Sequence, residues 1–434
     1  MALSVMESRP ETGLRAGRHF LLLQGPCGSF FRRLQIDLTA KGQASTRIVF
    51  NGGDLIDTGV SRGLVYRRSL ADWPSWVREL AERKGVTDLV VYGDCRHYHR
   101  LAIATLKPLG IRVHVLEEGY LRPNWVTCEP DGVNGNSALA SLDLDSVGGA
   151  VIDKPAETAE VELKGSHLSY MLAGTTYYFW TMVLSPWFPR YISHRDLELT
   201  GEAALWLGRI LSWPWRRRAA AQVLDKIHAL GKPVHLVLLQ LNGDSQIKEH
   251  SSFGSVRDVV EFCIAEFAAA GTSGQLLVFK NHPLDNGVIN LARLVRDEAE
   301  ARGLGERVFF VESPKLVPLF EKSVSVTAVN STACHQSLRR GIPTMVLGRA
   351  VFNHPQIVPR MRLADFFRLR PHRTVAYYDK LVNLMRHTSQ FNGGYYSKQG
   401  RDTLLLSLTD ALIAGEMRYE RFKIDTVSRV RQLA

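Results

Sequence analysis

The chain has 434 residues, 45% of them hydrophobic and 22% charged, an ordinary globular balance that, without repeats, argues against a solenoid. Its length exceeds what one hydrophobic core usually supports, so two domains are expected. Its formal net charge of +11 favours an anionic partner, such as nucleic acid, a phosphorylated substrate or an acidic membrane surface.

The five cysteines are scattered and form no CxxC pair. This pattern argues against a zinc site or a disulfide framework and favours a reducing compartment. The N-terminus lacks the apolar core of a signal peptide, so we expect a cytoplasmic protein. No run of about 18 apolar residues is present, and no membrane span is expected.

The first half of the chain alternates short apolar runs with amphipathic segments after a polar tail at residues 1–17. Strands are predicted at His19–Gln24, Arg47–Phe50, Asp88–Tyr92 and Arg112–Leu116, and helices at Ser29–Lys41, Asp72–Gly85 and His97–Leu109. Such alternation is typical of a parallel sheet covered on both faces. We expect this N-terminal Rossmann-like domain to span residues 18–165, with loops over residues 126–165, which are rich in Gly, Asn, Ser and Asp.

A second unit of the same kind follows residues 166–230, a predicted connecting segment that is rich in aromatic residues and contains Arg216-Arg217-Arg218. Strands are predicted at Pro233–Gln240, Gln275–Lys280, Arg307–Val311, Ser325–Val329 and Pro343–Leu347, and helices at Ser255–Ala270, Val288–Arg302 and Ala333–Arg340. This C-terminal Rossmann-like domain should span residues 231–360. Residues 361–434 are predicted to be a helical tail that packs across both domains. The fold class is therefore α/β, with two Rossmann-like domains in a GT-B-type arrangement.

Ligands of parallel sheets bind at the carboxyl ends of the strands. The first such loop begins with Glu117 and Glu118. Like charges and partial burial raise a carboxyl pKa, which would suit an acid/base role. The alternative, which spacing alone favours, is one solvated glutamate beside another that pairs with Arg122.

Asp244 follows a glycine turn at the end of another predicted strand. From there it could reach a ligand as a nucleophile or bind a hydroxyl group. Taken alone, an ordinary turn aspartate is the favoured explanation.

Two further strand ends carry groups that suit phosphate. Pro283 restricts His282 to an extended conformation, so its imidazole could hold a phosphate, although a surface histidine in a turn fits as well. Asn330-Ser331-Thr332 precede a predicted helix, where hydroxyl and N–H groups bind phosphate or simply cap the helix.

Other catalytic signatures are absent from the sequence: there is no HExxH, no P-loop and no GxSxG. Asp143-Leu144-Asp145 has the spacing that metal-dependent glycosyltransferases use for a divalent ion. Because it lies in a region without regular periodicity, we interpret it as incidental.

Together these loops resemble those of bacterial sialyltransferases and related transferases that use CMP-activated acidic sugars. The closer resemblance is to capsule polysaccharide proteins of the KpsS/LipB type, which are β-Kdo transferases. Seven motifs carry it, in order: Leu23-Gln24-Gly25-Pro26 with Gly28, Phe30 and Phe31; Phe50-Asn51-Gly52-Gly53-Asp54; Glu117-Glu118-Gly119-Tyr120-Leu121-Arg122-Pro123; Gln240-Leu241-Asn242-Gly243-Asp244-Ser245-Gln246-Ile247; Lys280-Asn281-His282-Pro283-Leu284-Asp285; Val329-Asn330-Ser331-Thr332; and Asn392-Gly393-Gly394-Tyr395-Tyr396-Ser397. The family usually has Lys-His-His-Pro where this chain has Asn281.

The resemblance implies transfer of Kdo from CMP-Kdo with retention at the anomeric carbon. Asp244 would attack the sugar, Glu117 or Glu118 would be the acid/base, and His282 would contact the CMP phosphate. The donor-binding set would comprise Gln240, Lys280, His282, Pro283, Asn330, Ser331 and Thr332. Positive charge, with Arg122 and Lys280 as candidates, would serve in place of a metal ion, and no cofactor is expected.

The acceptor implied by the resemblance is a lysophosphatidylglycerol-type lipid, on which the poly-Kdo linker of a capsular polysaccharide begins. The protein would then work at the inner face of the cytoplasmic membrane, with other capsule biosynthesis or export proteins as possible partners. Gly25, Gly28, Asn51, Asp54 and Arg122 would lie on the acceptor side. Residues 170–215 either bind the membrane or fill a core between the domains, and the sequence leaves both open.

Two alternatives remain at this point. One is a non-catalytic protein of a capsule assembly and export complex, and the other is a transferase of a different sugar, such as CMP-sialic acid or a UDP-sugar. Nucleic acid is not an expected partner, because residues 216–218 are the only compact basic run.

Overall fold

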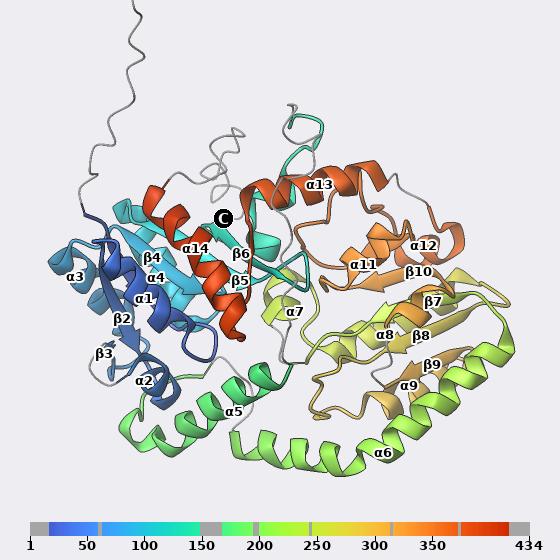
Figure 1. Cartoon of the computed structure of the whole chain (residues 1–434). Helices are drawn as coiled ribbons and strands as arrows, with labels where there is room; N and C mark the ends of the chain where they lie inside the picture. Colours follow the sequence, from blue (N-terminus) through green and yellow to red (C-terminus); the bar gives the residue numbers. More distant parts are fainter. Residues whose placement is uncertain are drawn as a thin grey trace, which may run out of the picture.

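Two mainly parallel β-sheets, each packed between helices, organise the protein (Figure 1). The structure is a computed structural model that describes residues 17–59, 63–147, 167–193, 199–242, 245–312, 316–371 and 375–415. In each sheet, five parallel strands lie side by side in the chain order third, second, first, fourth and fifth, which is the order of a Rossmann fold. The predicted α/β class with two Rossmann-like domains is therefore confirmed.

The N-terminal sheet has the strand order β12-β6-β5-β4-β1-β2-β3. Its elements up to residue 130 are the strands β1 (His19–Leu22), β2 (Ala44–Val49), β3 (Gly63–Val65), β4 (Asp88–Tyr92), β5 (Arg112–Glu118) and β6 (Trp125–Pro130) and the helices α1 (Phe30–Ala40), α2 (Gly52–Thr58), α3 (Trp73–Lys84) and α4 (His97–Leu106). One face packs against α3 and α4, and the other against α1 and the C-terminal helix α14 (Lys398–Ala414). The central strands are buried on both faces, which explains their continuous apolar runs.

The C-terminal sheet is entirely parallel, with the order β11-β10-β7-β8-β9. Its strands are β7 (Val234–Leu238), β8 (Leu276–Lys280), β9 (Val308–Val311), β10 (Ser323–Ala328) and β11 (Thr344–Val346), and its helices are α7 (Ser245–His250), α8 (Val256–Ala270), α9 (Leu291–Glu300), α10 (Leu316–Phe320), α11 (Cys334–Arg339), α12 (Leu363–Leu369) and α13 (Val375–Thr388). Helix α8 is an example of how local sequence sets the two ends of a helix. A capping box between Ser255 and Asp258 starts it, and Gly271 in a left-handed conformation ends it.

The last part of the chain returns to the N-terminal domain. Helices α12 and α13 pack against the second sheet. The chain then adds a short strand, β12 (Gln390–Asn392), to the edge of the first sheet, and α14 packs against α1. The tail was expected to be helical, and β12 is a strand that its sequence did not reveal.

The prediction of loops over residues 126–165 is wrong for residues 126–130, which belong to the strand β6, whereas residues 131–147 are irregular as predicted and 148–165 lie outside the described residues. Strand β6 pairs antiparallel with β5 and is fully buried. Two of its polar side chains have hydrogen-bond partners outside the strand: Gln390, far along the chain, donates to Thr127 at 3.0 Å, and Ser137, eight residues on, donates to Glu129. Because polar residues are buried in this strand, its sequence lacks the apolar pattern from which a buried strand is predicted.

The aromatic connecting segment contains two helices, α5 (His167–Val183) and α6 (Leu199–Leu230). Both run along the lower edge of the molecule in Figure 1. No described helix combines the length and the apolar character needed to cross a membrane.

Candidate active site

The acidic pair lies where β5 ends, in the N-terminal domain. Side chains alternate along a strand, so Glu117 and Glu118 project to opposite faces of the sheet. Burial, the largest cause, raises the pKa of Glu117 to about 7, and the charge of Glu118 adds to the rise. The carboxylate of Glu117 lies close to the loop after β4, where a Cβ on Gly93 would be 3.5 Å from its Oε2. Glu117 thus has the pKa of a group that can exchange a proton near neutral pH.

The carboxylate of Glu118 is engaged in a hydrogen bond within the N-terminal domain. The hydroxyl of Tyr92 donates to its Oε1 at 3.2 Å. The ring of Tyr92 meets that of Tyr395 edge to face, and the Tyr395 hydroxyl donates to the backbone carbonyl of Glu117 at 3.0 Å. The C-terminal tyrosine motif therefore supports the acidic loop, a role that the sequence did not indicate.

Arg122 follows the acidic pair in the loop after β5. Its side chain is exposed, and its Nε donates to the carbonyl of Gly119 at 3.3 Å. Burial is the main influence on the pKa values of Glu117 and His282, and the positive charge of Arg122 acts on both. Because such effects weaken with distance, Arg122 lies near enough to act on one predicted site residue in each domain.

His282 follows β8 and is partly buried. Burial, together with the charges of Lys280 and Arg122, lowers its pKa to about 4, so the imidazole is neutral at pH 7. Its Nδ1 accepts a hydrogen bond from the backbone N–H of Leu284 at 3.1 Å, which leaves the ring proton on Nε2. A neutral imidazole of this tautomer can donate one hydrogen bond to an anionic oxygen.

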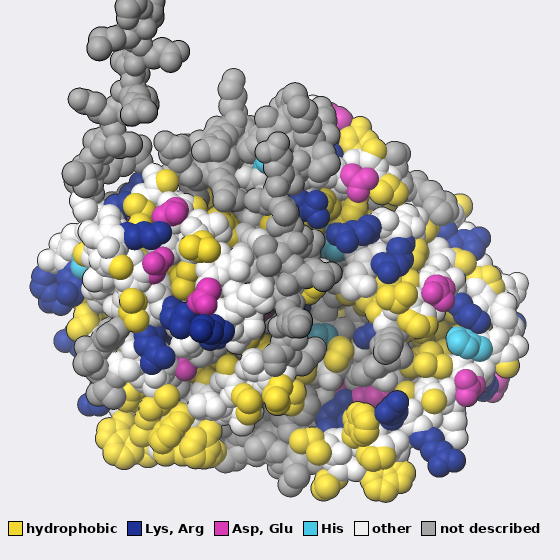
Figure 2. Space-filling view, viewed as in Figure 1, with side chains coloured by type: hydrophobic (Ala, Val, Ile, Leu, Met, Phe, Trp, Pro, Cys, Tyr) yellow, Lys and Arg dark blue, Asp and Glu magenta, His cyan; other side chains and the backbone are white. Residues whose placement is uncertain are grey.

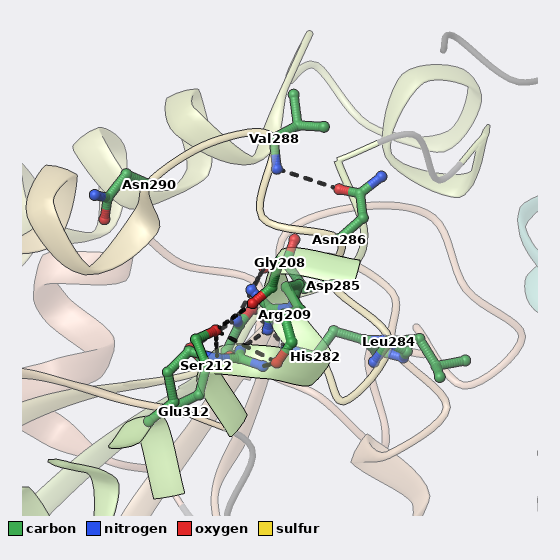
Figure 3. Close-up of polar contacts among 12 residues, drawn as sticks. Gly208, Arg209, Ser212, His282, Leu284, Asp285, Asn286, Val288, Asn290 and Glu312 are labelled. Carbon is green, nitrogen blue, oxygen red and sulfur yellow. Dashed lines mark hydrogen bonds and ion pairs between the residues drawn. The ribbon is translucent and has the colours of Figure 1, made fainter. Parts of the chain in front are cut away.

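Asn281, where the family usually has histidine, organises the loop of His282. Its Oδ1 accepts from the N–H of His282 at 2.8 Å, and its Nδ2 donates to Asp285 at 3.1 Å and to Glu312 at 3.3 Å. Arg209 of α6 pairs with the same two carboxylates, and Figure 3 shows this cluster. Neither Arg209 nor Glu312 belongs to a motif of the sequence, and only the fold brings them to this loop.

Gln240 and Asn330 join the loops after β7 and β10. Nε2 of Gln240 donates to Oδ1 of Asn330 at 2.9 Å, and the N–H of Asn330 donates to Oε1 of Gln240 at 3.1 Å. The strands β7 and β10 are neighbours at the point where the strand order reverses. Rossmann folds bind nucleotides at this switch point. The two amides thus shape the edge at which a nucleotide would lie.

The other predicted donor-binding residues lie at the same end of the sheet. Burial lowers the pKa of Lys280 to about 8, and its Nζ donates to the carbonyl of Asn281 at 3.1 Å. Ser331 and Thr332 are partly exposed, and Pro283 is exposed. Their roles toward a donor stay predictions.

Asp244 lies outside the described residues, but α7, which begins one residue later, is described. The end of α7 is attached to the N-terminal domain. His250 Nε2 lies 3.7 Å from Sγ of Cys95, and Glu249 forms an ion pair with Arg100 at 3.1 Å. Cys95 belongs to the loop after β4, the loop that also borders Glu117.

Asp94, Cys95 and His250 bring three possible metal ligands within 4.8 Å of one another. Arg349 Nη2 lies 3.2 Å from Nδ1 of His250. A guanidinium can only donate, so Nδ1 accepts and the ring proton lies on Nε2, toward Cys95. Asp94 already accepts from Asn136 at 2.9 Å, and burial raises the pKa of the Cys95 thiol. The cluster therefore fits a hydrogen-bonded joint between the domains better than a metal site, and its members are too distant in sequence to form a recognisable motif.

Asp143 and Asp145 also contact the other domain. Gln356 donates to the two carboxylates at 3.1 Å and 3.2 Å, and the hydroxyl of Tyr377 donates to Asp145 at 3.0 Å. The two aspartates of the DxD spacing thus take part in an exposed contact between the domains.

Asn51 and Asp54, predicted on the acceptor side, are both only 1% exposed. Asn51 caps α2 by accepting from the N–H of Asp54 at 2.9 Å. Tyr177 of α5 donates to Asp54 at 2.8 Å, and its hydroxyl accepts from Asn51 at 3.0 Å. These two residues anchor α5, and their position toward an acceptor stays a prediction.

Gly25 and Gly28 lie in the loop after β1. A Cβ on Gly25 would be 2.7 Å from the ring of Phe31, so a larger residue would displace α1. The N–H of Gly28 donates to Asp57 at 2.6 Å. Both glycines thus shape the loop locally, and their position toward an acceptor stays a prediction.

Comparison with known proteins adds an independent line of observation. The family described as capsule polysaccharide biosynthesis protein matches residues 87–396. The chain is 30% identical over 396 residues to the capsule polysaccharide export protein KpsS of Escherichia coli, a match that covers 90% of this chain and 100% of that protein. It is 27% identical over 411 residues to the capsule polysaccharide modification protein LipB of Neisseria meningitidis serogroup B, covering 92% and 96% of the two chains. A solved structure, the β-Kdo 2,7 transferase KpsC of Thermosulfurimonas dismutans, aligns with a TM-score of 0.43 and 12% identity over 91% of this chain and 100% of that one.

Proposed function

Because the chain belongs to the family of capsule polysaccharide biosynthesis proteins, we propose that it is a glycosyltransferase that moves Kdo from CMP-Kdo to a lysophosphatidylglycerol-type lipid. The product would begin the linker of a capsular polysaccharide at the inner face of the cytoplasmic membrane. One observation supports the proposal: Glu117 and His282, which come from different domains, are both under the electrostatic influence of Arg122.

The proposed reaction is a double displacement. Asp244 attacks the anomeric carbon of Kdo, and the bond to the CMP phosphate breaks, so that the phosphate leaves with the electron pair. The acceptor hydroxyl then attacks the same carbon, loses its proton to Glu117, and releases Asp244. Two inversions give net retention. Arg122 and Lys280 provide positive charge for the carboxylate of Kdo and the leaving phosphate, so the proposal requires no metal ion.

The direct test is incubation of the purified protein with CMP-Kdo and a lysophosphatidylglycerol dispersed in detergent. We expect release of CMP and a product heavier than the acceptor by one Kdo residue, both measured by mass spectrometry. The same incubation with CMP-sialic acid and with UDP-sugars tests the choice of donor. A folded protein that releases no CMP and forms no Kdo-lipid would refute the proposal.

A His282→Ala variant is expected to bind CMP about 10- to 100-fold more weakly, because a hydrogen bond to a charged phosphate is lost. Isothermal titration calorimetry with CMP measures the change. His228→Ala, on the exposed part of α6, is the matched control and should bind CMP as the unmodified protein does. Equal affinities of the two variants would remove His282 from the donor site.

A second candidate function follows from the name of the Escherichia coli relative, which is an export protein. A non-catalytic export component would keep its function in cells after Asp244→Asn. Complementation of a capsule-deficient strain distinguishes the two functions, since the proposed transferase should lose capsule production with this variant.

A further inference from the structure

Helix α5 has an unusual combination of composition and exposure. Its 17 residues include no Asp, Glu, Lys or Arg, yet most of its described side chains face outward. Leu172, Phe179 and, just beyond the helix, Trp187 are 58%, 50% and 58% exposed. A helix that is apolar around its circumference is normally buried in a protein core or in lipid. In this molecule Tyr177 is the only buried side chain of α5 among those described.

Helix α6 continues the same kind of surface. Ile210, Trp213 and Trp215 are 65%, 55% and 72% exposed. Figure 2 shows hydrophobic side chains gathered along the lower edge of the molecule, where Figure 1 places α5 and α6. We call the surface formed by Leu172, Phe179, Trp187, Ile210, Trp213 and Trp215 the apolar strip.

Both helices are fixed to the domains. Gly52 and Gly53 let α5 approach α2 closely, since a Cβ on Gly52 would be 2.2 Å from the carbonyl oxygen of Trp180 and one on Gly53 would be 2.7 Å from the ring of Tyr177. Arg216 joins α6 to the second domain through its ion pair with Glu312 at 2.6 Å. The strip is therefore a built part of the fold, and its exposure does not result from loosely attached helices.

Positive charge accompanies the apolar strip. The described stretches 167–193 and 199–218 contain five arginines and a single acidic residue. Of these arginines, Arg190, Arg217 and Arg218 are exposed, and the guanidinium of Arg217 lies over the ring of Trp213 at 5.4 Å. Tryptophan prefers the membrane interface, and arginine is attracted to anionic headgroups.

We propose that the apolar strip is the surface by which the protein docks onto an anionic phospholipid bilayer, with α5 and α6 lying in the interface. The docking surface depends on the proposed transferase function in one respect: the purpose of docking would be access to a lipid acceptor. A bilayer fits this surface better than a second copy of the chain, because two copies joined through the strip would bring their exposed arginines together. It also explains why one motif of the chain, Asn51–Asp54, is used to hold α5 in place.

The test uses the full-length protein and flotation with vesicles of phosphatidylcholine, either pure or containing about 30% phosphatidylglycerol. The unmodified protein should float with the anionic vesicles. The double variant Trp213→Ser/Trp215→Ser and the double variant Leu172→Gln/Phe179→Gln should each lower the partition coefficient by at least about tenfold, because large apolar side chains no longer enter the interface. Arg217→Gln and Arg218→Gln should each weaken binding to the anionic vesicles about fivefold and leave binding to pure phosphatidylcholine unchanged.

Leu369→Gln and Leu406→Gln are the matched controls, because these side chains are also exposed, at 68% and 75%, but lie on α12 and α14. They should bind vesicles as the unmodified protein does. Equal binding of the strip variants and the controls would overturn the proposal. So would light scattering that shows a lipid-free dimer of the unmodified protein which the strip variants convert to a monomer.

Assays with a detergent-dispersed acceptor separate this proposal from the proposed function. The strip variants should keep the transfer rate of the unmodified protein there and lose it only on vesicles. The protein could bind vesicles through the apolar strip and yet transfer no sugar under any condition. That result would refute the transferase function but would still support the docking surface.

Discussion

A Glu117→Gln variant is expected to transfer Kdo with a kcat/KM lower by about 10²- to 10⁴-fold, while its affinity for CMP is unchanged. Glutamine keeps the shape of the side chain but cannot accept the proton of the acceptor hydroxyl. Burial gives Glu117 a pKa of about 7, which is the range in which a base is both ionised at neutral pH and strong enough to act. Rates of CMP release with and without acceptor, together with calorimetry of CMP binding, measure the two quantities.

The pH dependence gives a second test of Glu117. A base must be ionised, and a carboxyl group with a raised pKa becomes ionised only as the pH rises through that value. We therefore expect kcat/KM of the unmodified protein to increase through about pH 7 and then to level off. The residual activity of the Gln variant should lack this increase.

Glu118→Gln is the matched control, since Glu118 follows directly and its carboxylate is engaged by the hydroxyl of Tyr92. Its kcat/KM should fall by less than about tenfold. A variant pair with the opposite order, in which Glu118→Gln is inactive and Glu117→Gln is active, would assign the proton transfer to Glu118.

An Asp88→Asn variant is expected to lower the free energy of unfolding of the N-terminal domain by about 3–5 kcal/mol. Asp88 is fully buried at the start of β4, where it accepts from Arg18 Nε and His114 Nε2, both at 2.8 Å. Arg18 Nη1 also donates to the carbonyl of Ile413 at 2.9 Å, which links the first strand to the last helix. Loss of the carboxylate charge leaves the buried Arg18 without compensation. Urea unfolding followed by tryptophan fluorescence measures the effect.

The lowered pKa of Asp88 makes the stability of the protein fall at acidic pH. Burial raises the pKa of Asp88, but the hydrogen bond and charge of His114, with hydrogen bonds from Arg18 and Thr87, outweigh burial and hold the pKa well below its ordinary value. This stabilisation is present above about pH 4 and is lost as the pH falls toward the lowered pKa. The Asn variant should lose less stability than the unmodified protein over that acidic range.

Glu306→Gln, which removes an exposed ion pair with Lys226, is the control and should cost less than about 1 kcal/mol. Equal losses in the two variants would show that the buried charge network of Asp88 does not stabilise the domain.

The sequence predicted the central parallel strands and the loops that follow them, because buried central strands need continuous apolar runs and their ends need turns. It missed β3, a three-residue edge strand in which Leu64 and Val65 are exposed. Asp88–Tyr92 was predicted with the bounds that the structure shows. The sequence did not predict β6, in which the buried polar residues Thr127 and Glu129 accept hydrogen bonds from Gln390 and Ser137, both outside the strand. It also did not reveal that 166–230 contains two long helices, since apolar and aromatic residues there follow no single buried face.

The candidate site, like the fold, could be predicted only in part from the sequence. Residue types at the strand ends indicated Glu117, His282 and their loops, because the chemistry of phosphate and proton transfer needs those groups. The choice between Glu117 and Glu118 needed the fold, since only the packing around each carboxylate sets its pKa and its partners. The contact of His250 with Cys95 is likewise a property of the assembled domains.

Local pattern and residue type were enough to predict the two Rossmann-like units, the order of their motifs and the resemblance to capsule polysaccharide proteins. The folded structure was needed to show that Asn51 and Asp54 anchor α5, that Asn281 positions His282, and that an apolar strip with arginines lies along one edge. The physical reason is that burial, hydrogen-bond partners and surface exposure are relations between residues far apart in the chain.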